Sequence, residues 1–201
     1  PNSVTTIGEQ AFADCEKLTS MDIPNSLTTV ESGTFRDCKK LTSVNIRSGV
    51  KTIGMEAFKN CKSLSNINIP NSVTSIGESA FYHCDSLTNI NMPNSVKSIG
   101  RGAFAYCKKL VNVTIPNSLT TIESQCFWDC RSLKSIIIPN SVKSIENSVF
   151  SGCLSLTEIN IPNSVKSIGQ SAFSLCHNLI SITLPNSLTT IESHCFWGCG
   201  S

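Results

Sequence analysis

The stretch from Ile69 to Gly100 reads IPNSVTSIGESAFYHCDSLTNINMPNSVKSIG, and the phrase Pro-Asn-Ser-Val occurs in it twice, 23 residues apart. The same interval separates all nine phenylalanines, from Phe12 to Phe196, and nine of the eleven cysteines. A fixed period is the signature of a repeat protein, in which each unit packs against its neighbours. The sequence predicts one array over residues 1–201, with eight full repeats and a ninth that stops after 17 residues, as in a fragment of a longer protein.

Each repeat predicts a strand, a corner and a helical turn, in that order. Residues 87–92 alternate apolar and polar side chains, which is the period of a strand with one buried face. Pro93 ends this strand, and the Asn-Ser pair after it favours a turn. Ala103, Phe104 and Cys107 then have the spacing of one face of a short helix. This order predicts an α/β solenoid with parallel strands, right-handed crossovers and an internal phenylalanine column.

The set Leu-x-x-Ile-x-Ile-Pro-x-Ser-Val-x-x-Ile-Gly-x-x-Ala-Phe-x-x-Cys, from Leu64 to Cys84, resembles the BspA-like class of leucine-rich repeats. The resemblance covers the whole chain and implies a right-handed leucine-rich-repeat superhelix, with a parallel concave β-sheet and short convex helices. In that class the ninth residue from the leucine often bonds the backbone across repeats; here it is a serine, as in Ser72, Ser95 and Ser118. The third repeat departs from the pattern at its corner, with Arg47-Ser48-Gly49.

The resemblance also bears on function and location. Domains of this class occur in surface and secreted proteins of bacteria and parasitic protists, where they are associated with adhesion and protein binding. The resemblance therefore implies a cell-surface or secreted location, while the residues themselves leave a cytoplasmic one open.

Eleven cysteines raise the question of disulfides or a metal site. In a column of stacked repeats neighbouring sulfurs stay about 4–5 Å apart, whereas a disulfide needs about 2 Å. The sequence thus predicts reduced, buried thiols that act as small apolar fillers. His194, Cys195 and Cys199 invite zinc, but both cysteines are predicted to face inward and no fourth ligand is evident. No metal and no cofactor is expected.

Catalysis and nucleic-acid binding have little support in the sequence. The three histidines, His83, His177 and His194, occupy different repeat positions and no nucleophile or carboxylate pair recurs with them, so we predict no enzyme. The net charge is +2, and one basic run is interrupted by Asp37, which favours a solvated face over a nucleic-acid site. That run comprises Arg36, Lys39, Lys40, Lys59 and Lys62. No apolar segment is long enough for membrane insertion.

Two polar columns are predicted along the concave sheet. One contains Ser20, Ser43, Asn66, Asn89, Asn112, Ser135, Glu158 and Ser181, and the other Asp22, Asn45, Asn68, Asn91, Thr114, Ile137, Asn160 and Thr183. Two interpretations stay open: the stacked side chains bond one another and keep the sheet soluble, or they form a hydrogen-bonding surface for a protein or glycan. The hypothetical partner-binding residues are Asn45, Asn66, Asn68, Asn89, Asn91 and Asn112.

Two tryptophans are secondary candidates on the convex side. Trp128 and Trp197 follow inward phenylalanines in the near-identical contexts SLTTIESQCFW and SLTTIESHCFW, so each is expected to face outward or to lie across the adjacent repeat. A duplicated block explains them simply, and a contact site is the alternative.

The function predicted from the sequence is a non-enzymatic recognition or adhesion module that binds a protein or glycan through an extended repeat surface. The alternatives are a structural stalk, or spacer, and an intracellular protein-interaction scaffold. A stalk predicts that no surface column departs from its consensus. Recognition predicts local departures, and the candidates are Arg47, Ile137, Glu158 and the two tryptophans.

Overall fold

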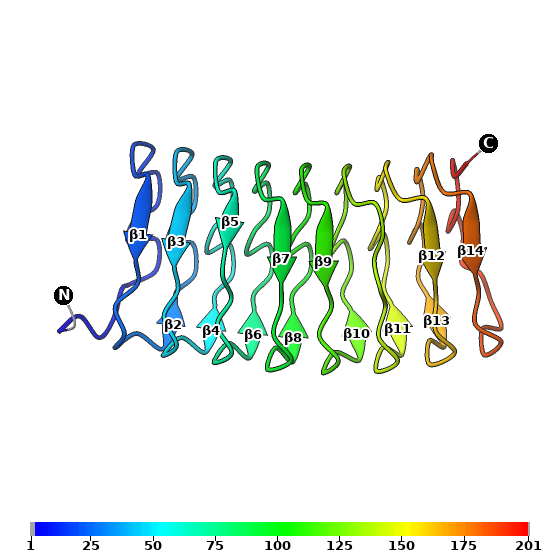
Figure 1. Cartoon of the computed structure of the whole chain (residues 1–201), viewed down its shortest axis with the longest axis horizontal. Coiled ribbons are helices and arrows are strands. Elements are labelled where there is room, and N and C mark those ends of the chain that lie inside the picture. Colours follow the sequence, from blue (N-terminus) through cyan, green and yellow to red (C-terminus); the bar gives the residue numbers. More distant parts are fainter. Residues whose placement is uncertain (1–2, 201) are drawn as a thin grey trace.

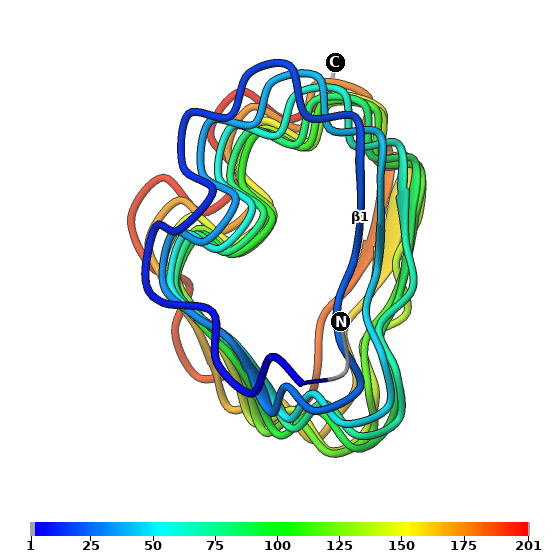
Figure 2. The ribbon, with the colours of Figure 1, turned by 90° about the vertical axis from the view of Figure 1, so that its left-hand side faces the viewer.

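The computed structural model describes residues 3–200 as one elongated stack of repeats, arranged side by side in chain order (Figure 1). Viewed along the stack, successive repeats follow nearly the same outline (Figure 2). Fourteen short strands and no helix are found among these residues. The corner expected at Pro1 and the last residue of the array, Ser201, lie outside the described part of the chain. The prediction of a parallel repeat solenoid is confirmed.

The first side of the solenoid, which we call the strand face, is built from the strands predicted before each proline. These strands pair in parallel with a register of one repeat, as in Ser20↔Ser43 and Asn89↔Asn112. The ladder is not continuous: it divides into β1-β3-β5, β7-β9 and β12-β14. Its members are β1 (Ser20–Asp22), β3 (Ser43–Asn45), β5 (Asn66–Ile67), β7 (Asn89–Asn91), β9 (Asn112–Thr114), β12 (Glu158–Asn160) and β14 (Ser181–Thr183).

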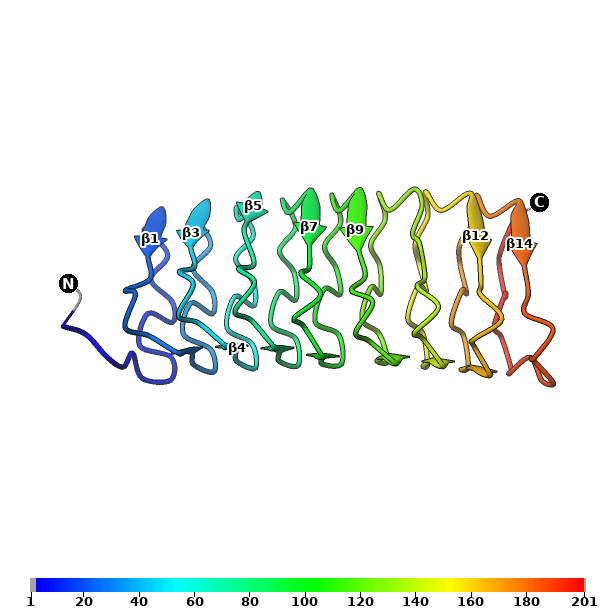
Figure 3. The ribbon, with the colours of Figure 1, turned by 60° about the horizontal axis from the view of Figure 1, so that its bottom comes forward.

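A second parallel ladder follows the corner and was not predicted as strands. It lies on a different side of the solenoid from β1 and β3, as the position of β4 shows (Figure 3). Each strand has only two residues, an outer Ser or Thr and a buried Ile or Val, because the chain turns again immediately afterwards. The strands are β2 (Thr29–Val30), β4 (Thr52–Ile53), β6 (Ser75–Ile76), β8 (Ser98–Ile99), β10 (Thr121–Ile122), β11 (Ser144–Ile145) and β13 (Ser167–Ile168).

The corner serine bonds across repeats as the resemblance implied, although not everywhere. The hydroxyl of Ser72 donates to the carbonyl oxygen of Val50 at 2.6 Å, and Ser118 bonds Val96 in the same way. The buried hydroxyl of Ser95 has no hydrogen-bond partner among the described residues. The exceptional corner at Arg47 keeps the same turn, with the Val50 N–H donating to the Arg47 carbonyl at 3.1 Å.

The expectation of short convex helices is wrong. The third side of the solenoid, which we call the turn face, consists of turns, and its alternate N–H groups donate to the next repeat: Phe12 to Thr34 at 2.9 Å and Asp14 to Arg36 at 2.8 Å. An α-helix would direct these donors to the carbonyl four residues earlier. Ala103, Phe104 and Cys107 do face inward as their spacing indicated, and all three are fully buried. Inward spacing alone therefore did not distinguish turns from a helix.

Backbone conformation explains why the turn face cannot be helical. In every repeat the tenth and fourteenth residues have positive φ, as in Gln10 (56°) and Asp14 (57°). Left-handed residues interrupt a right-handed helix, because only the right-handed conformation propagates its hydrogen bonds. The glycines at the eighth position, such as Gly54 and Gly100, are not among the positive-φ residues, as expected from the glutamates that replace them in other repeats.

The core is organised around the phenylalanine column. Successive rings from Phe12 to Phe196 stack with centroids 5.2–5.7 Å apart and planes within 15° of parallel. The seven internal rings, from Phe35 to Phe173, are buried. This confirms the predicted internal column, and it places the core between the strand face and the turn face along the whole stack.

The cysteine column lies beside the phenylalanines and does more than fill space. Each thiol of this column from Cys38 to Cys199 donates to the carbonyl oxygen of the phenylalanine in the preceding repeat, with Sγ to O distances of 2.9–3.4 Å. The same carbonyl accepts the N–H of the cysteine three residues further along, as in Phe58 and Cys61. All eleven cysteines are described and none forms a disulfide. The prediction of burial is wrong for Cys15, which is exposed, and holds only in part for Cys199.

Candidate functional site

The strand face carries the six asparagines proposed as partner-binding residues, and all six are exposed. They alternate with buried apolar residues such as Ile90, because successive side chains of a strand point to opposite faces. The structure therefore brings the asparagines together in the two predicted columns, over strands β3 to β9. Their exposure makes this surface available for contact.

Some of these amides bond one another along the columns. The Asn112 side-chain N–H donates to Asn89 Oδ1 at 2.9 Å, and the Thr114 hydroxyl donates to Asn91 Oδ1 at 3.3 Å. Among the hydrogen bonds of residues 3–200, the side chains of Asn66 and Asn68 take part in none. The interpretation that stacked side chains bond one another therefore holds for Asn89, Asn91 and Asn112, whereas Asn66 and Asn68 present uncommitted amides.

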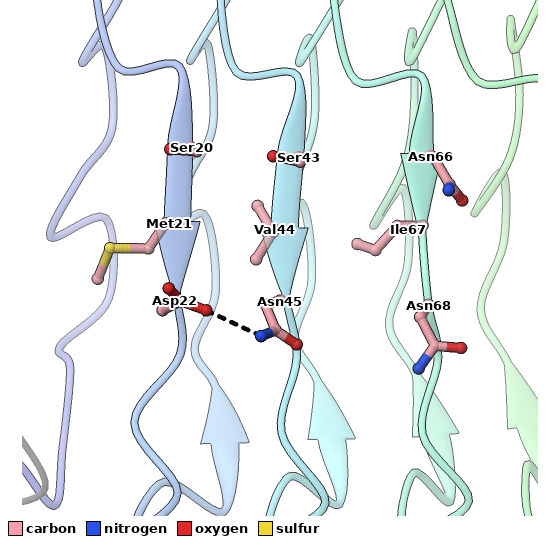
Figure 4. Close-up of a pocket in the computed structure, with 9 residues that line it drawn as sticks. All are labelled: Ser20, Met21, Asp22, Ser43, Val44, Asn45, Asn66, Ile67 and Asn68. Carbon is pink, nitrogen blue, oxygen red and sulfur yellow. Dashed lines mark hydrogen bonds between the residues drawn. The ribbon is translucent and has the colours of Figure 1, made fainter.

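A shallow polar hollow lies over the first three strands of the strand face (Figure 4). It forms where the small side chains of Ser20 and Ser43 precede Asn66 in one column. In the other column, the Asn45 side-chain N–H donates to Asp22 Oδ1 at 2.8 Å, and Arg47 Nη2 lies 3.3 Å from the same oxygen. The departure at Arg47 is therefore compensated by a local ion pair at this end of the strand face.

The other half of the strand face departs from the polar pattern. Ile137 occupies a column of polar side chains, and its side chain is 84% exposed. Its repeat contributes no strand to the strand face, only an isolated bridge between Thr114 and Ile137. Two hollows adjoin this isoleucine, one shared with Glu158 and Ser181 and the other with Thr114 and Pro162. This part of the strand face therefore combines an exposed apolar side chain with two adjoining hollows.

The turn face carries a second cluster, which we call the aromatic cluster and define as Tyr82, His83, Tyr106 and Trp128. The His83 and Tyr106 rings stack with centroids 4.4 Å apart, and Tyr106 meets Tyr82 and Trp128 edge to face at 5.3 and 4.8 Å. All four side chains are partly buried. Trp128 lies across the adjacent repeat, which is one of the two placements that the sequence predicted.

Trp197 has the same repeat position as Trp128 but a different environment. Its side chain is 61% exposed, and its ring makes one edge contact, to His194 at 6.4 Å between centroids. The residue of the previous repeat that corresponds to Tyr106 is Leu175. The two tryptophans are thus equivalent in sequence context and not in surroundings.

The repeat pattern of this chain matches that of a known protein family. The family model described as "BspA type Leucine rich repeat region (6 copies)" matches residues 1–110 and 74–201. The chain belongs to the BspA-type leucine-rich repeat family. Among curated proteins, none matches the chain significantly in sequence.

Solved structures of bacterial leucine-rich repeat proteins resemble this BspA-type chain. A T. pallidum leucine-rich repeat protein is 33% identical with a TM-score of 0.76, and the match covers 81% of this chain and 78% of that one. A Faecalibacterium prausnitzii protein, described as a leucine-rich cell surface protein, is 29% identical with a TM-score of 0.57, over 90% of this chain and 62% of that one. A Bacteroides ovatus leucine-rich repeat protein, 24% identical with a TM-score of 0.63 over 97% and 80%, shares the fold.

The BspA-type family indicates binding rather than catalysis. The described residues offer no catalytic or metal-binding group that would suggest otherwise. Leucine-rich repeats are generally protein-interaction modules, and no catalytic family is indicated. His83 Nδ1 lies 3.1 Å from Asp85 Oδ1, at the edge of the aromatic cluster. Among the described contacts, this pair has no serine or cysteine nucleophile beside it. Within residues 3–200, no three His, Cys, Asp or Glu side chains are grouped as metal ligands would be, His194 with Cys195 and Cys199 included.

Three of the five residues in the basic run of this BspA-type chain are paired with neighbouring carboxylates. Arg36 lies 3.5 Å from Glu56, Lys59 lies 2.7 Å from the same residue, and Lys39 lies 2.6 Å from Glu16. These pairs agree with a solvated face. No helix formed by residues 3–200 could cross a lipid bilayer.

The sequence missed three members of the aromatic cluster. Tyr82, His83 and Tyr106 lie at the thirteenth and fourteenth repeat positions, where aspartate, asparagine, serine and small residues also occur. The available signal was that both tyrosines of the chain lie 24 residues apart at adjacent repeat positions. Reading that signal required knowing that the thirteenth residue of one repeat lies beside the fourteenth of the next.

Proposed function

We propose that this chain is a non-enzymatic recognition module that binds a protein partner through the strand face. The observation that carries the proposal is Ile137, which is 84% exposed in a column that is otherwise polar and adjoins two hollows. A stalk that only spaces other domains has no use for this exposed apolar side chain, which water disfavours. An apolar anchor surrounded by hydrogen-bonding groups is the usual composition of a protein contact.

The asparagine strip supplies the hydrogen-bonding part of the proposed surface. Asn45, Asn66, Asn68, Asn89, Asn91 and Asn112 extend over four repeats, or about 14 Å at the spacing of parallel strands. Each hydrogen bond at such a wet surface contributes about 0.5–1.5 kcal/mol, so a partner must engage several together. We assign the main role to Asn66 and Asn68, because within residues 3–200 their side-chain amides form no hydrogen bond with the neighbouring repeats.

A cell-surface or secreted location is part of the proposal. Its support is family membership and the similar F. prausnitzii protein, which is described as a cell surface protein. An intracellular scaffold would use the same strand face, so the binding experiment tests the surface and leaves the location to be tested by immunolabelling of intact cells.

The test is an array of extracellular proteins probed with the wild-type chain and two variants. Ile137→Asn gives the column its usual polar residue and is expected to weaken binding at least tenfold, because it removes the apolar anchor. Ile180→Asn is the matched control: Ile180 is 81% exposed but lies outside both strand-face columns, so binding should not change. Equal binding by Ile137→Asn and wild type would overturn the proposal, and no binding by the wild type to any protein of the array would favour a stalk.

A further inference from the structure

The turn face concentrates its aromatic residues in one place. Both tyrosines of the chain, one of its two tryptophans and one of its three histidines meet within three consecutive repeats. Apart from Trp197, the thirteenth position elsewhere carries small or charged residues, such as Ser151 and Ser174, whose hydroxyls bond each other at 2.8 Å. The aromatic cluster is therefore a local feature and no consequence of the repeat.

Backbone conformation makes this local feature costly. The fourteenth residue has positive φ in every repeat, and six repeats place aspartate, asparagine or glycine there, which tolerate that conformation. His83 (57°) and Tyr106 (60°) occupy the same position and are bulky. Histidine tolerates this conformation better than other bulky residues do, so the strain falls on Tyr106, whose presence there indicates a role that the consensus residues do not fulfil.

The charges around the aromatic cluster balance. Lys59 lies 5.6 Å from the centre of the Tyr82 ring and 2.7 Å from Glu56, Lys108 lies 4.0 Å from Asp85, and Arg131 lies 3.0 Å from Asp129. Each cation has a carboxylate beside it. A polyanion would meet Asp85 and Asp129 and be repelled, and a free cation would compete with Lys59 for the ring. A neutral ligand fits these charges.

The size of the aromatic cluster argues against a protein as the occupant. A fully buried aromatic side chain accounts for 150–250 Å², so four partly buried rings expose on the order of 300 Å². A stable protein interface needs about 800 Å² from each partner. A short oligosaccharide matches the smaller area: its ring C–H groups pack on aromatic rings, and its hydroxyls bond to carboxylate and guanidinium groups such as those of Asp85, Asp129 and Arg131.

We propose that the aromatic cluster binds a neutral oligosaccharide, independently of the strand face. Tyr82, Tyr106 and Trp128 supply the stacking surface, and His83 supports Tyr106 from one side through the stacked contact at 4.4 Å. Asp129, held by the Nε of Arg131 at 3.0–3.1 Å from both its oxygens, is positioned as a hydroxyl acceptor at the tryptophan end.

The two tryptophans allow a direct test. In a Trp197→Phe protein, Trp128 is the only tryptophan, so its fluorescence reports on the aromatic cluster alone. This protein is titrated with gluco-, manno-, galacto- and xylo-configured hexasaccharides, and with a heparin hexasaccharide as the polyanion. At least one neutral hexasaccharide is expected to change Trp128 emission. The reciprocal Trp128→Phe protein, which reports through Trp197, should show no change.

Variants identify the residues responsible. Tyr106→Ala is expected to weaken binding of the responding hexasaccharide by about tenfold, measured by calorimetry. Asp129→Asn retains all four rings and is expected to weaken it severalfold, which keeps the test informative should Tyr106→Ala not fold. Ile137→Asn should bind the sugar normally, so failure here and failure of the proposed protein-binding function are distinguishable. No response to any neutral hexasaccharide, binding of heparin alone, or undiminished binding by Asp129→Asn and any folded Tyr106→Ala would overturn the proposal.

Discussion

The phenylalanine column and the aromatic cluster are both ladders of aromatic rings, and they cross the same repeats. Inside, Phe81 and Phe104 stack with their planes 3° apart, and the arrangement recurs along the whole chain. Outside, Tyr82 and Tyr106 meet at 67°, and the arrangement is confined to three repeats. One is imposed by the repeat, and the other is a departure from it.

The difference shows how repetition and function are separated in this fold. An interior position must suit the repeats before and after it, so small or apolar residues occupy it, and at the phenylalanine position one residue type recurs throughout. The thirteenth position, on the turn face, is less constrained and carries Arg36, Lys59, Tyr82, Ala105 and Trp128 in successive repeats. Contacts specific to a ligand can therefore arise only on the outer positions, while stability is carried by the columns inside.

Alkaline pH is expected to act most strongly on the interior. Burial raises the pKa of the Cys84, Cys130 and Cys153 thiols well above the usual 9.0, and that of Cys38 to about 11. The native state keeps protons that the unfolded state releases above pH 9.0, so stability is complete below that pH and falls above it. Each fully buried thiol should contribute about 1.4 kcal/mol per pH unit to the decline. Denaturant unfolding between pH 7 and 11 measures it.

A single-site variant provides the control for the pH experiment. Cys130→Ala removes one titrating thiol. The unfolding free energy of this variant should therefore fall with pH less steeply than that of the wild type, and the two slopes should differ by the contribution of one thiol. Its absolute stability is expected to be lower at pH 7, because the bond from Cys130 Sγ to the Phe104 carbonyl, 3.2 Å long, is lost. An unchanged slope would show that the thiols do not govern alkaline unfolding.

The next largest effect should separate the two aromatic ladders directly. Phe104→Ala removes a fully buried ring and is expected to cost about 3–5 kcal/mol of unfolding free energy. Tyr106→Ala, two residues away, removes a partly buried ring and should cost about 1 kcal/mol. Chemical denaturation of both variants at pH 7 measures the difference. Similar losses would mean that the aromatic cluster is a second core, and that binding is not needed to account for it.

The smallest expected effect concerns the outer position alone. Leu175 has a φ of 58° at the fourteenth position but lies outside the aromatic cluster. Leu175→Asn gives this position a residue that tolerates the left-handed conformation, and the stability should rise by up to about 1 kcal/mol. Thermal unfolding measures the gain. The Leu175 side chain lies against Gly198 of the next repeat. A loss of stability would show that this packing outweighs the backbone strain of Leu175, and would weaken the argument from Tyr106.

The interior of this protein was predictable because its signals repeat. Phe104 and Cys107 were assigned to the core from the 23-residue interval, and the outward placement of Asn89 and Asn91 followed from the alternation of the strand. Membership of the BspA-type family was likewise indicated by a pattern that recurs at fixed spacing. The convex helices were predicted wrongly because the spacing of inward residues is the same in a helical turn and in the observed turns.

By itself, the sequence determined the period, the parallel stacking and the identity of the inward columns, since periodic hydrophobic burial leaves one consistent arrangement. Only the tertiary structure decided that the turn face consists of turns and not of helices. The deciding hydrogen bonds run from N–H groups to the next repeat, and the sequence of a single repeat does not reveal them. It also decided that Tyr82, Tyr106 and Trp128 meet, whereas Trp197 remains largely exposed. Such contacts depend on which side chain the neighbouring repeat presents, and the repeat pattern does not specify that.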